Sequence, residues 1–183
     1  MQAPRVETSV AGGQRPDEQV RVIVACFGNL LRGDDGFGNT VARWLLREAV
    51  PAGVQVMEVG IGGIHLVQEL LAGVDALVVV DALDLGRPPG TVVVMRPDVL
   101  DVETLSPMAR RDQLADMHYS TPERALMLAR ALGVLPGDVW LVGCQVADPD
   151  QLGEGLSAAA VAGVPAAVSE VRRVVSEFGV DWS

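Results

Sequence analysis

Long apolar stretches alternate with helix-like stretches along this chain, and this alternation limits the folds that it can adopt. Residues 20–28 and 74–84 are continuous apolar runs rich in Val, Leu and Ala, typical of strands buried on both faces. Residues 36–50, 63–73 and 121–133 have apolar residues at helical spacing, bounded by Gly or Pro. Strands that alternate with helices form a mainly parallel sheet with helices on both faces. The sequence therefore predicts an α/β protein, a three-layer α/β/α sandwich.

The remaining elements fit the same architecture. One strand is expected to be antiparallel, because residues 91–95 follow the strand at 74–84 too closely for a helical crossover. That position also favours an edge of the sheet. The other predicted elements are strands at 53–60 and 138–146, a helix at 157–178 that Pro165 could kink, and an irregular or partly helical stretch at 97–117.

Composition and charge exclude several classes of protein. The net charge of −10 argues against a nucleic-acid partner, and all 14 basic residues are arginine, which removes mechanisms that need lysine. No apolar run is long enough to cross a membrane, and residues 1–19 have no signal-peptide core. We expect a disordered tail at 1–19 and a single domain at 20–178. Cys26 and Cys144 lie in apolar runs without zinc or disulfide spacing, which favours buried thiols and a cytoplasmic location.

The loop after the first strand carries an acidic pair. Residues 26–38 read CFGNLLRGDDGFG, and ligands in open parallel sheets bind outside the carboxyl ends of strands. The leucines of GNLLRG do not fit a dinucleotide fingerprint, and two carboxylates would repel a pyrophosphate. One acid of the pair is expected to cap the helix that begins at residue 36. We assign that structural role to Asp34, and we expect asparagine at that position to be tolerated.

Two further polar side chains are expected at the same edge of the sheet. Asp81 follows the apolar residues VVV at the end of a buried strand, and His118 lies in a loop just before the helix at 121. His65 is interpreted as structural. Converging carboxylates raise one another's pKa unless a cation joins them. Two carboxylates and an imidazole make an open site for a divalent metal such as Zn, Ni or Fe.

Other interpretations of these residues fit less well. A receiver domain of two-component signalling also has acids after two strands, but its acidic pair belongs at the strand tip and it needs a lysine. A haloacid-dehalogenase-type phosphatase has aspartates two apart after a strand, whereas VVVDALD spaces them three apart. A cysteine nucleophile at Cys26 would need a nearby histidine and exposure. A non-catalytic metal-binding or phospho-receiver-like signalling module on a flavodoxin-like fold stays open as the alternative.

The order of motifs resembles the hydrogenase maturation proteases. These enzymes remove a C-terminal extension from the large-subunit precursor of nickel–iron hydrogenases. The resemblance begins at GNLLRGDDGFG and extends over about residues 20–176. It continues through VVVDA, the loop histidine of HYSTPERALMLA, WLVGCQV and GEGLSAAAVAGVPAAV.

The resemblance implies roles for named positions. Asp35, Asp81 and His118 would be catalytic and would bind nickel already placed in the substrate, with no permanently bound cofactor. Substrate-binding positions would be Gly28, Asn29, Gly36, Gly38 and Glu58. The resemblance further implies that substrate nickel polarises a carbonyl or activates water, with a carboxylate as general base.

The chain departs from the family pattern at two positions. Many members have Glu where this chain has Asp35. The usual DGGT after the second strand reads EVGIGG, so Glu58 stands where an aspartate linked to substrate discrimination is expected. This departure implies a different hydrogenase partner class.

Overall fold

The computed structural model describes residues 19–115, 121–148 and 152–183. Five strands form one sheet in the order β2-β1-β3-β5-β4. Strands β1, β2, β3 and β5 run parallel, and β4 pairs antiparallel with β5 at one edge. The strands are β1 (Val22–Phe27), β2 (Val54–Gly60), β3 (Ala76–Leu83), β4 (Val92–Met95) and β5 (Asp138–Gln145). The predicted antiparallel edge strand is confirmed.

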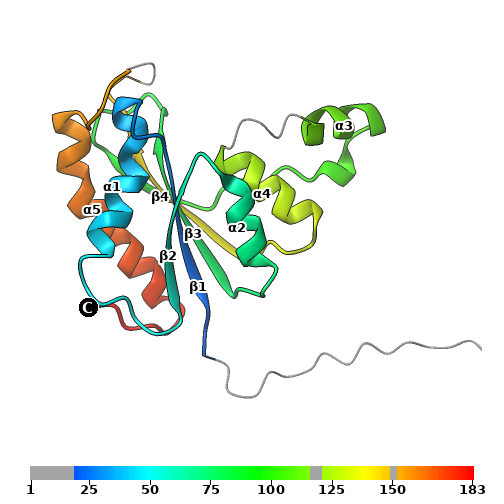
Figure 1. Cartoon of the computed structure of the whole chain (residues 1–183), viewed down its shortest axis with the longest axis horizontal. Coiled ribbons are helices and arrows are strands. Elements are labelled where there is room, and N and C mark those ends of the chain that lie inside the picture. Colours follow the sequence, from blue (N-terminus) through cyan, green and yellow to red (C-terminus); the bar gives the residue numbers. More distant parts are fainter. Residues whose placement is uncertain (1–18, 116–120, 149–151) are drawn as a thin grey trace, which may run out of the picture.

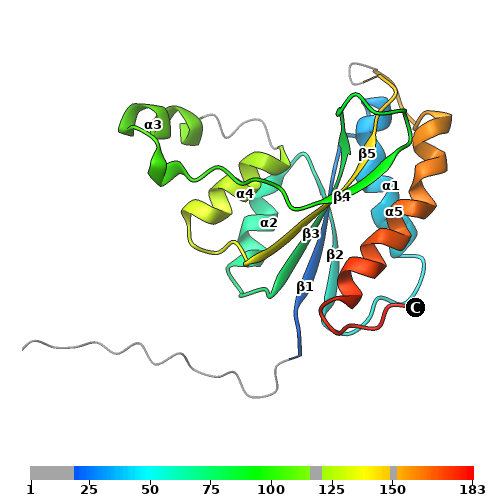
Figure 2. The ribbon, with the colours of Figure 1, turned by 180° about the vertical axis from the view of Figure 1, so that it is seen from behind.

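Helices cover both faces of this sheet, which confirms the three-layer prediction (Figure 1). Helices α1 and α5 cover one face, and α2 and α4 cover the other. Helix α3 stands apart from the sheet, and Figure 2 shows the same arrangement from behind. The helices are α1 (Phe37–Leu45), α2 (Gly63–Leu70), α3 (Pro107–Ala115), α4 (Pro122–Ala131) and α5 (Ala158–Ser176), with short 3-10 turns η1 (Gly33–Gly36) and η2 (Val102–Thr104).

Strand alternation divides the core into two clusters. Along β1, Val22, Val24 and Cys26 face α1 and α5, whereas Ile23, Ala25 and Phe27 face α2 and α4. All six are buried, as the continuous apolar run predicts. Because β1, β2, β3 and β5 run parallel, their carboxyl ends lie at one edge of the sheet, together with the loops that follow them.

Helix α1 is shorter than predicted and ends at Leu45 rather than near residue 50. Val50 precedes Pro51, and a residue before proline is disfavoured in the helical region, so the chain leaves the helix earlier. Helix α5 continues through Pro165 as one element, close to its predicted bounds of 157–178. The predicted tail at 1–19 lies almost wholly outside the described residues, and the division into a tail and a domain at 20–178 stays a prediction.

No helix in the described ranges has the length and apolar character needed to cross a bilayer.

Candidate functional site

An open cavity of about 560 Å³ lies at the carboxyl edge of the sheet. The loop after β1, the β2–α2 connection and the start of α4 form its walls. Its polar lining includes Asn29, Arg32, Asp35, Asp81, Thr121 and Glu123. Two of the three predicted catalytic residues, Asp35 and Asp81, therefore face one space, although they are 46 positions apart in the sequence.

Asp35 is held in place by a tight loop. It lies in the 3-10 turn η1, where its N–H donates to the carbonyl of Arg32 at 3.1 Å and its carbonyl accepts from Asn29 at 3.1 Å. The side chain is half-buried. Burial raises the pKa of the Asp35 carboxyl, while the Arg32 guanidinium and the main-chain N–H of Asn29 oppose that rise.

Asp81 lies in β3 just beyond the last residue that pairs with β1. Its neighbour Val80 faces α1 and α5, so the alternation of the strand turns Asp81 toward α2 and α4. Burial raises the pKa of Asp81 to about 8, the N–H of Ala82 opposes the shift, and the charges of Asp35 and Glu123 add to it. The charges of two neighbouring carboxyl groups thus act on Asp81 in this cavity.

Glu123 is a site residue that the sequence analysis missed. It lies in the first turn of α4, where acidic residues are common because a negative charge interacts favourably with the positive end of the helix dipole. That ordinary explanation hid its second property, which is that it lines the same cavity as Asp35 and Asp81. The sequence TPE at the end of the His118 loop was the available indication.

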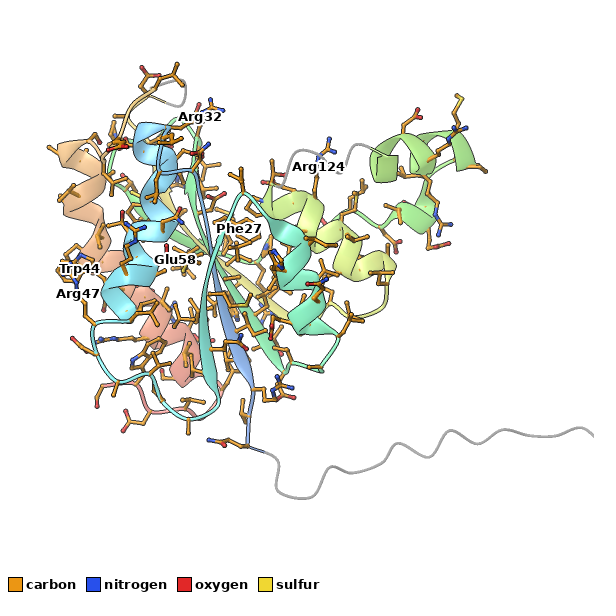
Figure 3. All side chains as sticks on the ribbon, viewed as in Figure 1. Phe27, Arg32, Trp44, Arg47, Glu58 and Arg124 are labelled. Carbon is orange, nitrogen blue, oxygen red and sulfur yellow. The ribbon has the colours of Figure 1, made fainter. Side chains whose placement is uncertain are left out.

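His118, the third predicted ligand, lies outside the described residues. Within the described part of the chain, no group of three or more His, Cys, Asp or Glu side chains is arranged to hold a metal ion. Arg32 is the one cationic side chain among the described residues that line the cavity. Figure 3 shows it at the edge of the sheet above the end of β1.

Two glycines let the acidic loop lie close to the sheet. Gly28 has φ +142°, and a Cβ there would lie 2.2 Å from the carbonyl oxygen of Asp35. A Cβ at Gly38 would lie 2.0 Å from the carbonyl oxygen of Phe27 and 2.7 Å from that of Val80. Of the predicted substrate-binding positions, Gly28 and Asn29 line the cavity. Gly36 and Gly38 do not.

Glu58 lies on the other face of the sheet from Asp81. It is in register with Cys26 of β1 and forms an ion pair with Arg43 of α1, with Nε and Oε2 3.5 Å apart. Figure 3 shows Glu58 between β2 and α1. The substrate-binding role expected for Glu58 stays a prediction, and the geometry places it beside α1 rather than in the cavity.

The structural role predicted for Asp34 is confirmed, but the predicted reason is wrong. Asp34 is buried, and no side chain caps α1. Its Oδ1 accepts from the N–H of Ser157 at 2.6 Å, and its Oδ2 accepts from Ala147 N–H and Ser157 Oγ, each at 2.9 Å. Asp34 therefore fastens the acidic loop to the end of β5 and to the N-cap of α5. Asparagine cannot make all three bonds, because its amide nitrogen would face an N–H donor.

The two cysteines are buried and free, as expected. Burial raises the pKa of the Cys26 thiol far above its usual range and that of the Cys144 thiol to about 11. A thiol in this state is a poor nucleophile at neutral pH. This agrees with the exclusion of a cysteine mechanism.

The fold and the cavity together define an α/β/α protein with an acidic cavity at the carboxyl edge of its sheet. The HycI family model, described as hydrogenase maturation protease, matches residues 40–174. The chain belongs to the hydrogenase maturation protease family. It is an endopeptidase of hydrogenase maturation that processes the C-terminus of the large subunit.

Relatives and solved structures agree with this assignment. The hydrogenase expression/formation protein HupD of Rhodobacter capsulatus is 32% identical over 162 residues, which cover 88% of this chain and 74% of HupD. The hydrogenase 2 maturation peptidase of a Thaumarchaeota archaeon is 32% identical, with a TM-score of 0.60 over 85% of this chain and 97% of that one. The hydrogenase maturating endopeptidase HybD of Escherichia coli shares the fold at 22% identity, with a TM-score of 0.69 over 88% and 96% of the two chains.

Proposed function

We propose that this endopeptidase recognises nickel already bound in the hydrogenase large-subunit precursor, and that Asp35, Asp81 and His118 contact that nickel. The observation that carries the proposal is the convergence of Asp35 and Asp81 on one open cavity, where neither forms an ion pair with another of the described residues. Arg32 offsets only part of the pKa rise of Asp35, and a metal ion brought by the substrate removes the repulsion that remains between the two carboxylates.

The position of His118 supports its place in this set. Thr121 lines the cavity, and His118 is three residues before it in the chain. Three residues of extended chain span at most about 10 Å, so the imidazole can reach the cavity. An imidazole added to two carboxylates gives the mixed nitrogen and oxygen ligands that suit nickel.

The substrate supplies what this site lacks. Two carboxylates and an imidazole leave coordination positions open, so the purified protein binds free divalent metal weakly. Nickel already held in the precursor brings its other ligands with it. In that position the metal would polarise the scissile carbonyl or activate a water molecule, and a carboxylate of the site would accept the proton of the attacking water and pass it to the leaving amine. We infer that the reaction takes place in the cytoplasm, where free thiols such as Cys26 and Cys144 stay reduced.

The two histidines of the chain form a matched pair for testing the site. His118→Ala is expected to lower the rate of precursor processing by at least roughly tenfold, because it removes a ligand of the substrate metal. His65→Ala, on the exposed side of α2, is expected to leave the rate unchanged. Both rates are followed by the gel shift of the large subunit on nickel-loaded precursor. Equal rates for the two variants would remove His118 from the site.

A further inference from the structure

A second cavity, of about 440 Å³, is built by the same loop that carries the carboxylates. The loop lines the first cavity with Asn29, Arg32 and Asp35. It lines the second cavity with a different set, namely Leu30, Leu31, Gly33 and Gly36. Since Arg32 lies between Leu31 and Gly33 in the chain, the two cavities are separated by little more than the thickness of the loop.

Leucine and glycine make up most of the lining of the second cavity. Leucines 30, 31 and 156 supply aliphatic surface, and Gly33, Gly36 and Gly155 leave main chain without side chains over it. Gly33 and Gly155 have φ values of +53° and +90°, which glycine adopts without strain. Main chain without Cβ atoms lets a bound peptide approach closely.

The main chain of Leu31, an exposed leucine of this cavity, is hydrogen-bonded at both its N–H and its carbonyl. Leu31 is 63% exposed, although its N–H donates to Asn29 Oδ1 at 3.0 Å and its carbonyl accepts from Gly153 N–H at 3.0 Å. Gly33 N–H donates to the Gly153 carbonyl at 2.7 Å, which completes a short parallel bridge between the two loops. Leu152, next to this bridge, is 79% exposed. Exposed aliphatic side chains grouped on well-anchored loops beside a ligand site are common on recognition surfaces.

Three polar side chains also line the cavity. Arg43 and Glu154 line it together with Thr40. Arg43 also pairs with Glu58, but both side chains are well exposed, and ion pairs of this kind are weak. A peptide backbone can therefore compete for the guanidinium, and Glu154 offers an acceptor for a peptide N–H.

We propose that the second cavity is a subsite for the C-terminal extension of the precursor, which inserts an aliphatic side chain between Leu30, Leu31 and Leu156. This inference rests on the proposed function, because it takes the nickel centre to lie over Asp35 and Asp81. With the nickel on one side of the loop, the flexible extension needs to cross only residues 31–33 to enter the second cavity. Its occupant is therefore a segment of the same substrate.

Two leucines with the same exposure give a matched test. Leu31 and Leu71 are both 63% exposed, and Leu71 lies at the far end of α2. With nickel-loaded precursor as the probe, Leu31→Asp is expected to raise KM by roughly tenfold or more, while kcat stays within about threefold. Leu71→Asp should leave both constants unchanged. Thermal melts of the two variants should coincide, since neither side chain belongs to the core.

A shortened substrate identifies the part of the precursor that is bound. A precursor whose extension is shortened to one or two residues beyond the scissile bond should be processed at equal rates by the wild type and Leu31→Asp, as followed by mass spectrometry. Equal KM values for Leu31→Asp and Leu71→Asp on the full precursor would overturn the subsite. So would a wild-type dimer that Leu31→Asp converts to a monomer without a change in KM, since a second copy would then occupy the cavity. The comparison of Leu31→Asp with Leu71→Asp can be made even if nickel-free precursor is cut. The subsite and the proposed function can therefore be disproved independently.

Discussion

Asp81→Asn should lower precursor processing by more than roughly 100-fold and at the same time make the metal-free protein more stable at neutral pH. Removal of a group that only hydrogen-bonds to a metal ligand typically lowers activity about 10- to 100-fold. The loss of processing should be larger here, because the Asp81 carboxylate is itself a proposed ligand. The gain follows from burial, which raises the pKa of Asp81 to about 8. The folded state then resists ionisation of a carboxyl group that is ionised in the unfolded chain at pH 7.

The sign of this effect fixes its pH dependence. Because the folded-state pKa of Asp81 lies above the unfolded value of 3.8, the unfolded chain releases its proton first, and the wild type loses stability as pH rises from about 4 to about 8. The stability advantage of Asp81→Asn should grow across that range and level off above it. One pKa unit corresponds to about 1.4 kcal/mol, so the total amounts to several kcal/mol.

Urea unfolding of both proteins at several pH values measures the stability difference, and the gel shift of the precursor measures activity. Asp84→Asn is the matched control, since Asp84 is exposed at the same edge of the sheet but does not line the cavity. It should retain processing. An Asp81→Asn protein that cuts precursor at the wild-type rate would exclude Asp81 from the chemistry, whatever its stability.

Asp34→Asn, unlike Asp81→Asn, should destabilise the protein and lower its free energy of unfolding by about 3 kcal/mol. The buried Asp34 carboxylate accepts three hydrogen bonds, two from main-chain N–H groups and one from the hydroxyl of Ser157. Asparagine keeps one acceptor oxygen and turns an NH2 group toward an N–H donor, so at least one buried donor loses its partner. It also removes the negative charge near the N-terminus of α5.

Denaturant unfolding tests this prediction, with Asp98→Asn as the control. Asp98 is exposed and makes no hydrogen bond or ion pair in the described part of the chain, so its substitution should change stability by less than about 0.5 kcal/mol. If Asp34→Asn is as stable as Asp98→Asn, the carboxylate does not fasten the loop. Processing by Asp34→Asn is measured separately at low temperature, where the variant is folded. A loss of processing there shows how precisely Asp35 must be placed.

Local sequence pattern was sufficient to predict the layers of the fold. The apolar run of β1 identified a strand buried on both faces, and the short connection before β4 identified the antiparallel edge. Both features depend on neighbours in the sequence. Asp35 and Asp81 were also accessible, because parallel strands place their carboxyl ends at one edge of the sheet.

Features that depend on distant residues could not be predicted in the same way. Asp34 accepts hydrogen bonds from Ala147 and Ser157, which lie more than 110 positions away in the sequence. The residues next to Asp34 in the sequence suggested a helix cap instead. Glu123 had an ordinary explanation as a first-turn acid of a helix. The second cavity depends on the bridge between Arg32 and Gly153, which no periodicity indicates.

In the proposed complex, nickel held by the precursor joins the two proteins at Asp35, Asp81 and His118. Wild-type processing of nickel-loaded and nickel-free large-subunit precursor is compared at equal concentrations by gel shift, with zinc-supplemented nickel-free precursor as the control. Only the nickel-loaded form should be cleaved, and zinc should not restore cleavage of the nickel-free form. Efficient cleavage of the nickel-free precursor would show that nickel does not join the two proteins.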